Sequence, residues 1–98
     1  MKIVFHVEGS NFGKANDIVL KNDILSRQSI TFKDAKLAGL EKEGYCLIID
    51  GSEEAISEAR KLLKDLVTEV VHKERDKVLE ILQKEEESAN VGFGSIFG

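Results

Sequence analysis

The sequence lacks most of the residues that mark specialised classes of protein. Its 98 residues include no proline, no tryptophan and one cysteine, Cys46. A single cysteine excludes an internal disulfide and offers no metal-ligand spacing, so we expect a cytoplasmic protein without a metal site. Neither a secretory signal pattern nor an apolar stretch of roughly 20 residues is present, so we expect no secretion and no membrane contact.

Charge is abundant but unevenly distributed. Charged residues make up 33% of the chain, and the formal net charge is −4. Residues 1–40 have a small excess of basic side chains, whereas residues 41–98 are strongly acidic. An acidic domain is a poor general binder of a phosphate backbone, so the net charge disfavours nucleic acid as a partner. The content of lysine and glutamate is compatible with a thermophilic source.

Local patterns predict most of the elements in the first half of the chain. KIVFHV, at 2–7, alternates and predicts a half-buried strand, and SITF, at 29–32, predicts a second. YCLIID, at 45–50, is the most apolar run and predicts a central strand. Residues 15–26 have the spacing of a helix, with a tight hairpin as the alternative. Residues 34–44 are ambiguous between helix, strand and loop.

The second half of the chain begins with a clear helix signal. Ser52 can cap a helix, and Glu53 and Glu54 would lie at the positive end of its dipole. An apolar stripe follows, is interrupted by HKERDK at 72–77 and resumes at Val78. A single helix over 53–87 would be about 52 Å long, so we expect it to break near 72–76 or to overhang the domain. Glutamates at 85–87 predict fraying there.

These elements predict an α+β fold. We expect a small single-layer sheet with helices packed on one face, in the order β-α-β-β-α, as one domain over 1–88. Residues 89–98 would form an apolar tail that contains glycine and phenylalanine. The predicted core consists of Ile3, Phe5, Val7, Leu47, Ile49, Ile56, Leu63 and Leu66. The parity of the third strand, with either Leu47 and Ile49 or Ile48 facing inward, remains open.

The loop GSNFGKA, at 9–15, resembles a phosphate-binding loop only in part. A Walker A loop requires GxxxxGK followed by Ser or Thr. Here three residues separate Gly9 from Gly13, and Ala15 replaces the hydroxyl. GxGxxG is absent too. We therefore predict a turn whose glycines permit positive φ, and we expect no nucleotide or other cofactor.

The segment LIIDGSEEAISEARKLLKDLV, at 47–67, resembles the last strand and helix of a KH domain, and ferredoxin-like domains share similar local pieces. The KH resemblance implies binding of single-stranded nucleic acid through a GxxG loop between two helices. The chain has GxxxG instead, after a strand. This alternative function would use Gly9, Ser10, Asn11, Gly13, Lys14, Lys21 and Arg27. It predicts that Lys14, Lys21, Arg27 and Lys33 converge on one surface.

Catalytic signatures are missing from the sequence. His6 and His72 have no partner at metal spacing, and Cys46 lies in an apolar strand where a thiol acts as a small hydrophobe. We therefore expect a non-enzymatic protein. A small enzyme whose site is assembled from residues distant in sequence is the second alternative.

The tail GFGSIFG combines aromatic residues with three glycines. Such side chains need burial to stay ordered, in the protein's own core, in a sister subunit or in a different protein. The leading interpretation is an interaction or regulatory module that forms a homo-oligomer or docks a protein partner. The residues expected to mediate this contact are Val78, Leu79, Leu82, Phe93, Ile96 and Phe97.

Overall fold

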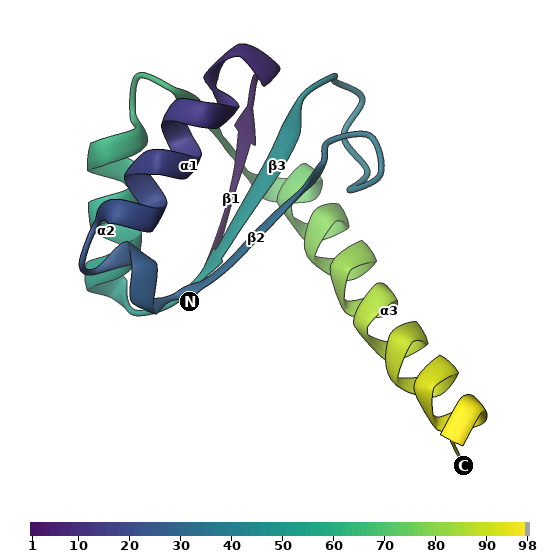
Figure 1. Cartoon of the computed structure of the whole chain (residues 1–98). Helices are drawn as coiled ribbons and strands as arrows, with labels where there is room; N and C mark the ends of the chain where they lie inside the picture. Colours follow the sequence, from purple (N-terminus) through teal and green to yellow (C-terminus); the bar gives the residue numbers. More distant parts are fainter. Residues whose placement is uncertain (98) are drawn as a thin grey trace.

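The computed structural model describes the backbone of residues 1–97 and the side chains of residues 1–85. The chain has the predicted α+β architecture (Figure 1). Its elements are β1 (Lys2–Val7), α1 (Phe12–Lys21), β2 (Ser29–Asp34), β3 (Tyr45–Asp50), α2 (Glu53–Leu63), β4 (Val67–Val70) and α3 (His72–Phe97), with short 3₁₀ turns η1 (Gly9–Asn11) and η2 (Leu25–Arg27). None of the described helices is both long and apolar enough to cross a membrane.

The strands form one antiparallel sheet in the order β2-β3-β1-β4. β1 and β3 occupy its centre, and β1 pairs along one side with β3 and along the other with β4. The predicted order β-α-β-β-α holds as far as α2, and β4 and α3 are added to it.

One face of the sheet carries the predicted core. α1 and α2 both pack on this face (Figure 1). The predicted core residues are all buried there except Leu66, which is partly buried. Leu47 and Ile49 point toward α1 and α2, which settles the parity of β3.

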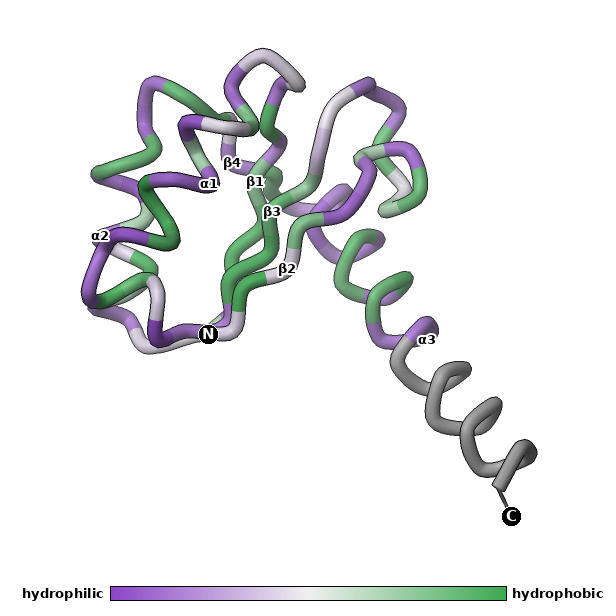
Figure 2. Tube along the Cα trace, in the orientation of Figure 1, coloured by the Kyte–Doolittle hydropathy of each residue, from purple (hydrophilic) through white to green (hydrophobic). Residues whose placement is uncertain are grey.

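The opposite face of the sheet is also covered, beyond the prediction of helices on one face. Val4, Cys46 and Ile48 are buried on this second face beneath the turn at 35–40 and Val78 of α3. Figure 2 shows hydrophobic residues along β1 and β3, between the α1–α2 layer and α3. The physical reason is that β3 is apolar on both sides, so a sheet covered on one face would leave Cys46 and Ile48 in water.

The interruption of the long helical pattern begins earlier than predicted. α2 ends at Leu63, and residues 67–70 pair with β1 as an edge strand. The Arg60 guanidinium contacts the Glu69 carboxylate through two hydrogen bonds, of 3.0 and 3.2 Å, which tie α2 to β4. α3 then begins at His72, whose φ is 56°. The predicted fraying at 85–87 is not observed, since α3 extends to Phe97.

Turn chemistry explains the two segments that were ambiguous in sequence. The Asn22 Oδ1 accepts hydrogen bonds from the backbone N–H groups of Ile24 and Leu25, each 2.9 Å long, so α1 ends at Lys21 instead of reaching residue 26. The Asp34 Oδ1 accepts in the same way from Lys36 and Leu37, at 2.9 and 3.2 Å. Residues 35–44 are therefore a loop, with positive φ at its two glycines.

Candidate functional site

The loop at 9–15 is a turn that leads directly into a helix. Gly9 begins η1, and Gly13 already lies in the first turn of α1. Among the described glycines, positive φ occurs at Gly39 and Gly44, so the predicted turn forms without the positive φ that its glycines permit. The Phe12 ring packs against Phe32, with ring centroids 4.9 Å apart, and against Tyr45, at 4.3 Å.

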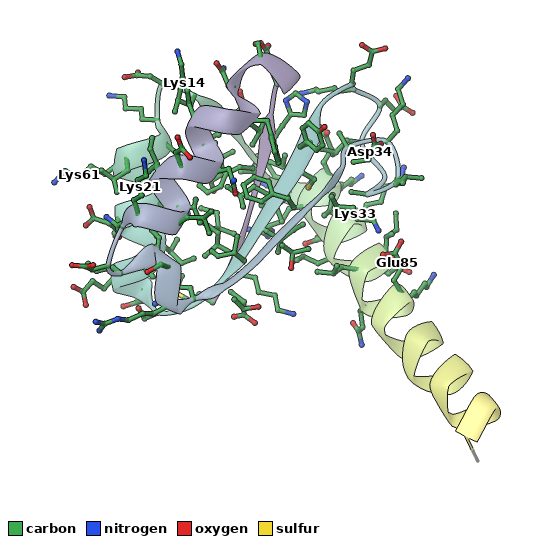
Figure 3. All side chains as sticks on the ribbon, in the orientation of Figure 1. Lys14, Lys21, Lys33, Asp34, Lys61 and Glu85 are labelled. Atoms are coloured by element: carbon green, nitrogen blue, oxygen red, sulfur yellow. The ribbon has the colours of Figure 1, made fainter. Side chains whose placement is uncertain are left out.

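The basic residues of the nucleic-acid alternative do not gather on one surface. Lys14 and Lys21 extend from α1, in the helical layer (Figure 3). Lys33 lies on the α3 side of the sheet, where its ammonium pairs with the Glu85 carboxylate. Arg27 ends η2, beyond the C-terminal end of α1. Lys33 therefore does not share a surface with Lys14 and Lys21, as the nucleic-acid alternative requires.

The candidate interaction residues of α3 fall into two groups. Val78 is 1% exposed, and Leu79 and Leu82 pack partly buried against the second face of the sheet. These three residues thus contact their own domain. Phe93, Ile96 and Phe97 lie outside the residues whose side chains are described.

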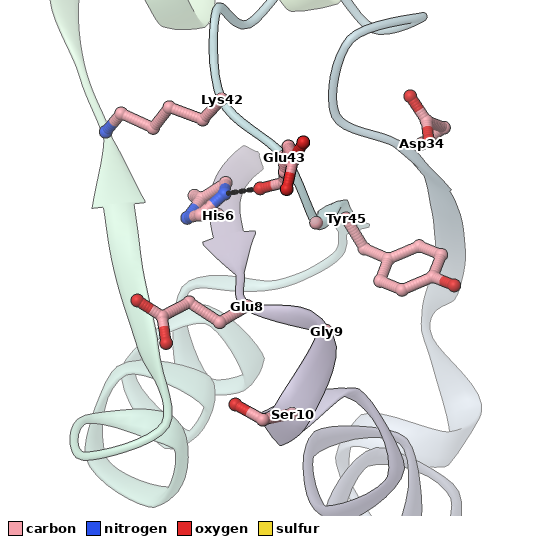
Figure 4. Close-up of a pocket in the computed structure, with 9 residues that line it drawn as sticks. His6, Glu8, Gly9, Ser10, Asp34, Lys42, Glu43 and Tyr45 are labelled. Carbon is pink, nitrogen blue, oxygen red and sulfur yellow. Dashed lines mark hydrogen bonds between the residues drawn. The ribbon is translucent and has the colours of Figure 1, made fainter.

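A hollow lies where β1 ends and β3 begins. It has a volume of about 700 Å³, and its lining includes His6, Glu8, Ser10, Lys42 and Tyr45 (Figure 4). A second hollow of about 250 Å³ shares His6 and Glu8 and continues toward β4. We call the two together the His6 groove.

His6 is held in a defined orientation at the centre of this groove. Its side chain is buried, with 9% of the residue exposed, on the second face of the sheet. The ring Nε2 lies 2.7 Å from the backbone carbonyl oxygen of Glu43 (Figure 4). A carbonyl can only accept, so Nε2 carries a proton and donates it. In the neutral ring, Nδ1 is then an acceptor, and no residue described in the structure occupies it.

Gly44 permits this arrangement. Its φ is 106°, and a Cβ at this position would lie 2.5 Å from the carbonyl oxygen of Val7 and 3.3 Å from the His6 Nε2. Only a residue without a side chain fits such a close approach in this backbone conformation. The loop can therefore fold over the end of β1 and present the Glu43 carbonyl to His6.

Cys46 lies opposite His6 in the β1–β3 register, but its chemistry is different. It is fully buried, and burial raises the pKa of the thiol to about 11. The thiol therefore stays protonated near neutral pH and is a poor nucleophile. This agrees with the interpretation of Cys46 as a small core residue.

Sequence reasoning missed the groove. It treated His6 as an isolated side chain, because no local motif links residue 6 to residue 43. The signal that could have been used is the alternation of β1, which places His6 on the same face as Val4. Among the described residues, no group of three His, Cys, Asp or Glu side chains could hold a metal ion.

No protein-family model, curated protein or solved structure matches the chain. Its function is therefore argued from two features of its own geometry. One is the His6 groove, and the other is the length of α3.

Proposed function

We propose that this protein is a non-enzymatic interaction module that self-associates through the C-terminal part of α3. The observation that supports the proposal is the difference in length between α3 and the sheet. α3 has 26 residues, which correspond to about 39 Å, whereas a six-residue strand such as β1 spans about 20 Å. Among the residues whose side chains are described, those of α3 that pack on the sheet run from Val78 to Leu82.

The sequence of the second half of α3 calls for an apolar partner. It contains Val91, Phe93, Ile96 and Phe97. Most helices in proteins are stabilised by the burial of an apolar face against another element. A second copy of the chain offers the same apolar segment in return, as an isologous interface requires. We therefore propose a homo-oligomer in preference to a complex with a different protein.

The strand order supports a ferredoxin-like classification as part of the same proposal. Strands and helices alternate as β-α-β-β-α-β up to β4, with the strand order β2-β3-β1-β4. The KH-like alternative expects its binding loop between two helices, whereas here η1 follows a strand. The buried thiol of Cys46 fits a reducing compartment, so we also propose a cytoplasmic location.

Solution mass tests the self-association. Multi-angle light scattering at several concentrations would compare the full chain with the double variant Phe93→Ser/Ile96→Ser. We expect an oligomer for the full chain and a monomer for the variant, with unchanged unfolding of the domain. Leu37→Ser is the matched control, because Leu37 is 68% exposed on the loop at 35–44. A full chain that stays monomeric at every concentration would contradict the proposal.

A further inference from the structure

We propose that the His6 groove binds the primary ammonium group of a small organic cation. The proposal does not depend on self-association through α3, since the groove lies at the β1–β3 end of the domain. It rests on the hydrogen-bond acceptors of the site and on its local charge.

The acceptor at the centre of the groove is the His6 Nδ1. The hydrogen bond from Nε2 to the Glu43 carbonyl fixes the ring and leaves Nδ1 as the free nitrogen. The side chain is nine-tenths buried, but Nδ1 keeps contact with solvent in the groove, where a donor can reach it. Glu8 lines both hollows beside His6, and its carboxylate forms no hydrogen bond or ion pair with any residue whose side chain is described. An ammonium group has three N–H donors and no acceptor, which suits two neighbouring acceptors.

The charge of the groove favours a cation. Its lining contains four carboxylates and one ammonium group; the charged residues are Glu8, Asp34, Glu43, Asp65 and Lys42. The Lys36 ammonium lies 3.9 Å from Glu43 and offsets part of that charge. A hollow lined mainly by charges of one sign raises the local concentration of the opposite ion. The exposed carboxylates attract any cation, whereas the His6 Nδ1, which is open to the groove, selects one that can donate a hydrogen bond.

The organic part of the ligand would extend from the ammonium group toward the open side of the larger hollow, which Tyr45, Lys42 and Asp34 border. The Tyr45 ring itself lies on the α1 side of the sheet, packed against Phe12, whereas the His6 ring lies on the second face. The contacts that define the site are therefore those of the ammonium group.

An NMR titration of the ¹⁵N-labelled full chain with n-butylammonium chloride tests the proposal. We expect saturable shifts at the amides of Glu8, Gly9 and Gly44, together with a change in the ¹⁵N resonance of the His6 Nδ1. Tetramethylammonium chloride has the same charge but no N–H group. We expect it to bind at least about tenfold more weakly, because it cannot donate to His6 or Glu8.

Matched variants separate the site from general attraction to an acidic protein. Glu8→Gln should weaken n-butylammonium binding about tenfold. Glu54→Gln changes the net charge equally at an exposed side chain of α2, near the other end of the sheet, and should leave the affinity unchanged. Equal binding of the two cations, or equal effects of the two variants, would mean that cations are attracted only by the general acidity of the surface, and would overturn the proposal. Shifts that do not saturate would overturn it too.

Discussion

Gly44→Ala should destabilise this protein more than any other glycine-to-alanine change discussed here. At φ 106°, alanine enters a region that side-chain-bearing residues avoid, at a cost of roughly 1–3 kcal/mol. The new Cβ would also lie 2.5 Å from the Val7 carbonyl oxygen. That oxygen belongs to the backbone of β1, which pairs residue by residue with β3, so it cannot move aside alone. Weakening about one hydrogen bond at this point adds roughly 1 kcal/mol.

The expected loss is therefore about 2–4 kcal/mol in the free energy of unfolding, measured by urea denaturation. Gly13→Ala is the control, since a Cβ there meets nothing within 4 Å and alanine favours the helix, which predicts a gain of about 0.5–1 kcal/mol. Gly39→Ala should fall between them, because its φ is also positive but its Cβ meets the flexible ends of Ile81 and Lys77. A loss below about 1 kcal/mol for Gly44→Ala would refute the reasoning.

Three further predictions concern the core on the second face of the sheet and the cap of α2. Because burial raises the pKa of the Cys46 thiol from 9.0 to about 11, the folded state holds this proton more tightly than the unfolded chain. The contribution of the protonated thiol to stability is complete below pH 9.0 and declines as the pH rises through about 11. In urea denaturation across this range, the free energy of unfolding should therefore decline less steeply for Cys46→Ala than for the unchanged chain. Val78→Ala should lower the free energy of unfolding by about 2–3 kcal/mol in thermal denaturation, and an unchanged value would mean that α3 does not stay docked on the second face. Ser52→Ala removes the hydrogen bond that the Ser52 Oγ accepts from the Ala55 N–H, and should lower the free energy of unfolding by about 1 kcal/mol. Ser57→Ala, at an exposed position of α2, should leave it nearly unchanged in the same thermal denaturation assay.

The elements that could be predicted from the sequence are those with a complete local signal. β1 alternates, β3 is a short apolar run between two glycines, and Ser52 caps α2 as expected. Each of these signals depends on neighbours within a few residues. The core beneath α1 and α2 followed from the same patterns, because alternation and helical spacing specify which side chains share a face.

β4 could not be predicted, because its signal is not local. Leu66 and Val70 continue the helical spacing of α2, and four residues are too few to display a clear alternation. The segment becomes a strand because β1 offers an open edge to it and because Arg60 contacts Glu69. The same limit applied to the groove, since His6 acquires its role from a carbonyl 37 residues later in the chain.

The position of β1 in the sheet has a consequence for how the chain folds. β1 is synthesised before the other strands, yet its two neighbours are residues 45–50 and 67–70. Pairing over such long separations closes large loops and slows folding relative to a fold built from local contacts. A nascent chain shorter than about 70 residues would keep one edge of the apolar strand KIVFHV unpaired. An open strand edge can pair with other chains, so premature termination or slow elongation before β4 should expose this protein to aggregation.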